Sequence, residues 1–156
     1  MTVGTRSILL TLIATAVLAG TLDLIFATSF WSLRGVPPQR ILQSIAAGAQ
    51  GAGAYGGGTA SAVLGVTLHY LIATCMVLVF YLASRRWPVL VEFPWLAGCA
   101  YGVLLYLVMT WVVVPLSAAP APRPAPVDLS WVLASIAAHM LLVGLPCAWA
   151  AWRLRT

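Results

Sequence analysis

Four apolar stretches, each long enough to cross a lipid bilayer as a helix, constrain the fold of this chain more than any other feature. They cover about residues 7–31, 59–84, 95–117 and 129–152. A bilayer core takes about 20 helical residues, and each stretch reaches that length. None alternates apolar and polar residues as an outer-membrane barrel strand does. The sequence therefore predicts an all-α integral membrane protein, a single bundle of four transmembrane helices over residues 1–156.

The composition excludes a water-soluble fold, because 62% of the residues are hydrophobic and only 7% are charged. A soluble domain of this length exposes far more polar surface. Arg6 before the first stretch is also compatible with a signal peptide. The apolar run continues through Leu22 and Phe26, beyond the length of a signal core, so a retained helix is expected.

Arginines set the expected orientation, since the chain has no lysine. If four helices alternate in direction, five arginines share one side: Arg6, Arg85, Arg86, Arg153 and Arg155. The other side receives Arg34, Arg40 and Arg123. The positive-inside rule then predicts that both termini lie in the cytoplasm. Topology and lipid headgroups account for the net charge of +5, so the lipid bilayer is the expected partner and a nucleic acid is not.

The two outer connections differ in character. "PPQRILQSIAAGAQ", ending at Gln50, predicts a short amphipathic helix with an apolar face of Ile41, Leu42, Ile45 and Ala49. Gln43, Ala47 and Gln50 fall opposite that face, and a glycine-rich hinge follows. The second connection, 117–130, is a proline-rich strap in which Asp128 and Ser130 are candidate helix caps.

Each predicted span contributes one polar group at nearly the same level of the membrane: Asp23, His69, Tyr106 and His139. An acid at the centre of a membrane helix costs about 2.5–3.5 kcal/mol on insertion scales, so it usually faces the bundle interior. At about 1.5 Å per residue, the four positions lie about 10 to 16 Å below the outer ends of their spans. Their common depth predicts one polar cluster in the outer half of the bundle. Taken singly, each histidine could equally bond a backbone carbonyl, and Tyr106 could be a packing residue.

Small residues predict where helices approach closely. Gly20 flanks Asp23, Gly65 lies one turn before His69, and Gly98 and Gly102 form a G-x-x-x-G pair in the third span. These four glycines are candidate helix-packing positions. The three cysteines fall inside predicted spans without a C-x-x-C pair, so they are expected to be small buried hydrophobes.

The segments "LHYLIATCMVLVFY", "AGCAYGVLLY", "VVVPLS" and "ASIAAHMLLVG" resemble small four-span bacterial inner-membrane proteins. More distantly, the chain is similar to the YagU-like group connected with acid resistance. The resemblance covers about the last 90 residues, from Gly65 onward, and leaves out Asp23. It implies a helical inner-membrane protein associated with proton stress, and it carries over no catalytic residue.

Three classes of function remain open from the sequence. The polar cluster could handle protons or a small solute in a carrier or an acid sensor. The glycine faces could instead bind other membrane helices, or a second copy, in a non-catalytic subunit or assembly factor. Thirdly, His69 and His139 could ligate a haem, or a metal ion together with Asp23. No Ser/His/Asp order, cysteine nucleophile or acidic pair suggests an enzyme, and no cofactor is expected.

Overall fold

A computed structural model describes residues 4–120 and 127–155, and within these ranges the chain is helical without a β-strand. Four helices are long and apolar enough to cross a membrane: Thr5–Ser32, Gly58–Arg86, Pro94–Leu116 and Leu129–Arg153. Every boundary lies within two residues of the stretch expected from the sequence. The predicted all-α, multi-pass membrane fold is confirmed.

The first two spans are the uninterrupted helices α1 (Thr5–Ser32) and α3 (Gly58–Arg86). Between them lie α2 (Pro38–Gln50) and the 3₁₀ turn η1 (Gly51–Gly56). After the short α4 (Val89–Glu92), the third span consists of α5 (Pro94–Val108), η2 (Met109–Val113) and α6 (Val114–Leu116). The fourth consists of α7 (Leu129–Ala138), η3 (His139–Gly144) and α8 (Leu145–Arg153).

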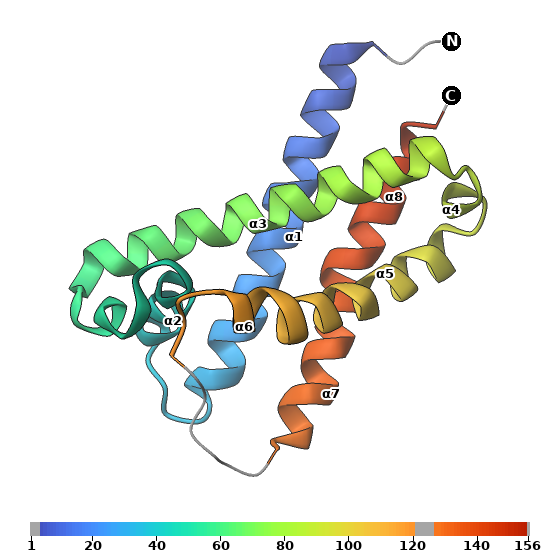
Figure 1. Ribbon diagram of the computed structural model, residues 1–156. Helices are drawn as coiled ribbons and strands as arrows, with labels where there is room; N and C mark the ends of the chain where they lie inside the picture. The colour runs from blue at the N-terminus through green and yellow to red at the C-terminus, as the bar shows by residue number, and fades with distance from the viewer. Residues whose placement is uncertain (1–3, 121–126, 156) are drawn as a thin grey trace.

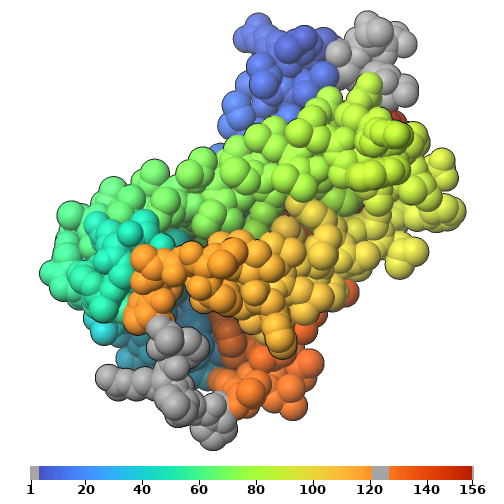
Figure 2. Space-filling view, viewed as in Figure 1, coloured from blue at the N-terminus to red at the C-terminus, as the bar shows by residue number. Residues whose placement is uncertain are grey.

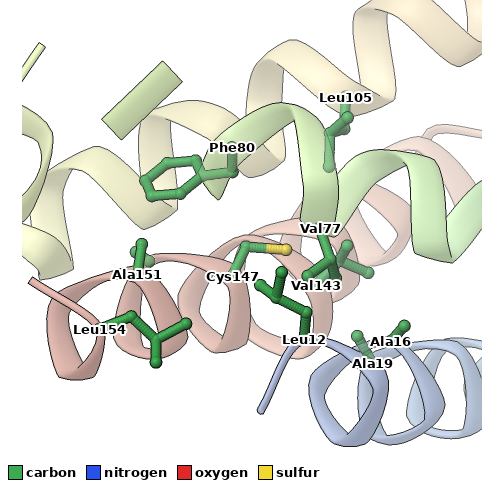
Figure 3. Close-up of a cluster of buried hydrophobic side chains, with 11 residues drawn as sticks. Leu12, Ala16, Ala19, Val77, Phe80, Leu105, Val143, Cys147, Ala151 and Leu154 are labelled. Atoms are coloured by element: carbon green, nitrogen blue, oxygen red, sulfur yellow. The ribbon is translucent and has the colours of Figure 1, made fainter. Parts of the chain in front are cut away.

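The chain runs back and forth, so both termini and α4 lie at one end of the bundle and α2 lies at the other (Figure 1). Helix α3 packs against α1 and α8, while α5 packs against η3 and α8. An apolar core fills the region where these helices meet, toward the end that carries the termini (Figure 3). Its members include Leu12, Ala16, Ala19, Val77, Phe80, Leu105, Val143, Cys147, Ala151 and Leu154.

The third and fourth spans each contain a π-helical segment, and each segment ends two residues before a proline. Segment η2 precedes Pro115, and η3 precedes Pro146. Proline lacks an N–H and its ring crowds the carbonyl four residues earlier, so the preceding turn widens. Such turns change the direction in which side chains project, and they recur at functional sites. His139 is the first residue of η3.

Helix α2 packs on α3 through small and polar residues. Gln43 is buried and donates to the Gly58 carbonyl at 3.1 Å, while Ser61 donates to Gln50 Oε1 at 2.8 Å. Ala47 is fully buried, whereas Ala49 of the expected apolar face is exposed. The helix thus forms as predicted, but Gln43 and Ala47 of the face opposite the apolar one are buried. Packing is this tight because Gly65 of α3 has no side chain, and a Cβ there would lie 2.0 Å from the Leu42 carbonyl oxygen.

The residues that follow the third span also contact α2. The Ala118 N–H donates to the Gly48 carbonyl at 2.9 Å, and this segment lies against α2 on the molecular surface (Figure 2). Residues 121–126 of the expected proline-rich strap, with Arg123, lie outside the described residues. At its end, Asp128 caps α7 by accepting from the Trp131 N–H at 3.1 Å. The Ser130 hydroxyl and this N–H hold the pKa of Asp128 below its usual value.

Candidate functional site

A cleft of about 940 Å³ occupies the half of the bundle that the apolar core leaves open. Its walls come from all four spans and from α2 and η1. The polar residues expected from the sequence all line it: Asp23 from α1, His69 from α3, Tyr106 from α5 and His139 from η3. Each of these side chains is partly buried. One polar group from each membrane span therefore faces a single shared space.

Asp23 reaches the cleft between small residues of its own helix, because Gly20 and Ala27 line the same wall. Its carboxylate makes no hydrogen bond or ion pair with any residue of the described ranges. An acid in a largely apolar surrounding needs a proton, water or a ligand to offset its desolvation. Asp23 is thus available to a proton or a bound molecule.

His69 is anchored to α1 by a contact that a neighbouring glycine permits. Its Nε2 donates to the Gly20 carbonyl at 2.8 Å. Tyr70 lies directly over Gly20, where a Cβ would come within 2.9 Å of the ring, and its hydroxyl lies 2.8 Å from Thr21 Oγ1. Gly20 therefore lets α3 approach α1 closely enough for the histidine bond to form. With Nε2 donating, the Nδ1 of a neutral His69 is an acceptor.

His139 is oriented by its own helix and by Tyr106. Its Nδ1 donates to the Ser135 carbonyl at 2.8 Å, which leaves Nε2 as the acceptor of the neutral ring. The Tyr106 ring meets the imidazole edge to face, with centroids 5.9 Å apart. This arrangement depends on Gly102, whose missing Cβ would lie 2.5 Å from the His139 carbonyl oxygen. Helix packing and cleft geometry are thus coupled at this position.

The four polar side chains share the cleft without bonding to one another. Each histidine donates a hydrogen bond from one ring nitrogen to a backbone carbonyl. This is the structural role that the sequence allowed for each histidine taken singly. Asp23 forms no hydrogen bond or ion pair with either histidine. In the part of the chain that is described, no group of three His, Cys, Asp or Glu side chains is arranged to hold a metal ion.

Other cleft residues escaped the sequence reasoning. Arg40 of α2 lines the cleft together with Tyr55 of η1, and its guanidinium lies 3.9 Å above the Tyr55 ring. Trp31 and Trp131 form an aromatic wall, with ring centroids 5.2 Å apart. The α2 pattern held a usable signal, because Arg40, Ile41 and Ser44 fall on one helical face and all three line the cleft.

The candidate packing glycines are all sites of close approach. Gly20 and Gly65 admit Tyr70 and Leu42, as described above, and Gly98 and Gly102 face the fourth span. A Cβ on Gly98 would lie 3.0 Å from the Gly144 carbonyl oxygen, and one on Gly102 would lie 2.4 Å from Met140 Cα. Gly144, which was not among the candidates, completes this crossing, since its Cβ would lie 2.1 Å from the Gly98 carbonyl oxygen.

The cleft combines an unpartnered carboxylate, two imidazole acceptors, a guanidinium and an aromatic wall. These groups suit reversible binding and proton exchange, and they lack the positioned nucleophile and base that covalent catalysis requires. In comparisons with family models, with curated proteins and with solved structures, the chain matched none, so its function is inferred from the cleft.

Proposed function

We propose that the protein is a proton-linked transporter of a small solute in a bacterial inner membrane. The observation that carries this proposal is the convergence of Asp23, His69, Tyr106 and His139, one from each span, on one cleft. Polar groups inside membrane spans mark solute pathways and proton relays more often than packing. The volume of about 940 Å³ lies within the range of about 300–1,000 Å³ that is common for small-molecule sites.

The proposed proton linkage rests on the lack of a bonding partner for the Asp23 carboxylate in the described ranges. A carboxylate without a protein partner is stabilised in the membrane interior by a proton or by a ligand that donates to it. A proton and a solute that both depend on Asp23 affect each other's affinity, which is the thermodynamic basis of coupling. Two further protonatable side chains, His69 and His139, line the same cleft.

Transport also requires that access alternates between the two sides of the membrane. The apolar core fills the bundle toward the termini, and the cleft lies in the half that carries α2. The π-helical segments η2 and η3 flank the cleft and are places where the third and fourth spans can bend. The same cleft without net flux would serve as a sensor of envelope acid stress, the setting that the YagU-like resemblance suggests.

Proteoliposomes with a trapped pH-sensitive dye test the proposal. Amino acids, amines, carboxylates and sugars are added in turn outside vesicles that carry an imposed proton gradient. We expect at least one class to accelerate proton entry, and a protonophore or protein-free vesicles to remove the effect. Folded protein that gives no solute-dependent proton entry with any class would overturn the transport proposal. A pH-dependent conformational change in such protein would favour the sensor.

The proposed topology can be tested separately. With both termini in the cytoplasm, reporters fused to either end or inserted after Arg86 should report a cytoplasmic location. A reporter inserted in the strap beside Arg123 should report the periplasm. The arginines support this orientation, since Arg6, Arg85, Arg86, Arg153 and Arg155 belong to the end that carries the termini and α4. A periplasmic C-terminus would contradict it and place the half of the bundle that holds the cleft toward the cytoplasm.

A further inference from the structure

We propose that the solute of this cleft is a small zwitterion, with its ammonium group at Asp23 and its anionic group at Arg40. This inference rests on the proposed function and names the substrate class of the same site. It starts from the charged residues of the cleft wall, which carries one acid and one arginine among the residues that the structure describes. Asp23 comes from α1 and Arg40 from α2, so the two charges belong to different walls.

Neither charge is neutralised within the described ranges. The ion pair formed there is Arg34–Asp128, at 3.8 Å, and neither of its members lines the cleft. Asp23 and Arg40 do not pair with each other, although they face the same space. A molecule that carries both charges can meet the two residues together, and it brings no net charge into the membrane interior.

The surroundings of Asp23 are those of an ammonium site. In their neutral forms, His69 and His139 each donate through one nitrogen to a backbone carbonyl, so the other nitrogen of each of these cleft-lining residues keeps a lone pair. Two imidazole acceptors and a carboxylate match the three N–H donors of an ammonium group. The same set would repel a carboxylate, because it presents acceptors and a negative charge. The cationic end of the solute therefore belongs at this end of the cleft.

Arg40 is prepared for the anionic end. Its guanidinium carbon lies 3.9 Å from the centroid of the Tyr55 ring, and Nη1 donates to the Tyr55 carbonyl at 3.4 Å. Stacking covers one face and restrains the fork, while the remaining N–H groups are left to donate. A planar fork held in this way binds a carboxylate or phosphate through paired hydrogen bonds.

The cleft wall also favours an apolar body on the solute. Trp31 and Trp131 line it, as do Ile41 and Met109. A solute with an aromatic or branched side chain would replace water against these surfaces and gain affinity from their burial. An amino acid such as phenylalanine combines the two charges with that body, and serves as a probe of the class.

Three probes of nearly equal shape separate the charges: L-phenylalanine, L-phenylalaninamide and 3-phenylpropanoate. The first is a zwitterion, the second is a cation and the third is an anion. Binding to the full-length protein in lipid nanodiscs is measured by isothermal titration. We expect the zwitterion to bind the wild-type protein at least about ten-fold more tightly than either analogue.

Matched variants assign each charge. Asp23→Asn should weaken binding of the zwitterion and of the amide but not of 3-phenylpropanoate. Arg40→Gln should weaken binding of the zwitterion and of 3-phenylpropanoate but not of the amide. Asp128→Asn and Arg34→Gln, which alter the ion pair outside the cleft wall, should change none of the three affinities. Equal affinities for the three probes, or no binding up to millimolar concentration, would overturn the zwitterion assignment. If the proteoliposome assay still showed proton entry with a solute that carries a single charge or none, the proposal of proton-linked transport would stand without the zwitterion. If no solute caused proton entry, both proposals would be wrong.

Discussion

Gly102→Leu should prevent the bundle from assembling, whereas Ala100→Leu, two residues earlier in the same helix, should be tolerated. A Cβ on Gly102 would lie 2.4 Å from Met140 Cα and 2.5 Å from the His139 carbonyl oxygen. Both are backbone atoms of the fourth span, so no rotamer change can relieve the contact. We expect a loss of more than about 3 kcal/mol in the free energy of unfolding, above the usual cost of overpacking.

The effect should be large because this crossing is glycine against glycine. Gly144 of the fourth span lies against Gly98 and Gly102 of the third, and its own Cβ would lie 2.1 Å from the Gly98 carbonyl oxygen. In a bilayer, helix association depends on such van der Waals contacts, since lipid tails are as apolar as the side chains. Separating the two spans also displaces His139, so Gly102→Ala should distort the cleft even where the protein still folds.

Thermal unfolding of detergent-purified protein, followed by size-exclusion chromatography of a fluorescent fusion, measures this prediction. Ala100 is the matched control because its side chain is exposed and Ala100→Leu places the same leucine side chain on the lipid-facing surface. Leu104→Ala removes bulk from that surface and should also be tolerated. If Gly102→Leu unfolded at the same temperature as Ala100→Leu, the close crossing would have no energetic importance.

The spans and the polar position in each were readable from the sequence because both follow from local rules. A bilayer demands long apolar helices, and Asp23, His69, Tyr106 and His139 stand out against such a background. Helical rise then converts sequence position into depth, which is why residues far apart in the chain could be grouped. These inferences require no knowledge of which helices touch.

The docking of α2 could not be read in this way. In water, the side of an amphipathic helix with Gln43 and Ala47 would face solvent, but here it packs on α3 while Ile41 and Ile45 line the cleft. Burial within a membrane protein favours small residues and satisfied polar groups, because lipid accepts apolar ones. The role of Arg40 depends on this docking. The positive-inside rule predicted on which side of the membrane Arg40 lies, but it could not predict that Arg40 lines the cleft.

The pairing of Asp23 was also beyond the sequence. Depth placed it level with two histidines, but the backbone carbonyls of Gly20 and Ser135 accept the histidine N–H bonds instead. Every residue has a backbone carbonyl, so the pattern of side chains does not show which carbonyl will accept a hydrogen bond. The consequence is functional, since a carboxylate that is not clasped by its neighbours is available to a proton and a solute.

Asp23→Asn should therefore abolish solute-linked proton flux while leaving the protein folded. The amide keeps the shape of the acid but cannot carry a proton or a negative charge, so we expect the flux in proteoliposomes to fall at least about ten-fold, a change of about 1.4 kcal/mol. The melting temperature should hardly change, because the carboxylate has no partner within the described ranges that would be orphaned. Asp23→Leu should be equally stable or more so, since it removes a charged group from an apolar surrounding.

The double variants decide between one cluster and independent sites. If Asp23 and the histidines act on one proton and one solute, Asp23→Asn combined with His69→Gln or His139→Gln should lose no more flux than Asp23→Asn alone. Asp128→Asn is the control, because it removes an exposed acid that pairs with Arg34 outside the cleft wall, and it should retain full flux. Losses that multiply in the doubles would show separate roles for the acid and the imidazoles. Full flux in Asp23→Asn would remove the acid from the mechanism altogether, and with it the reason for a proton to travel with the solute.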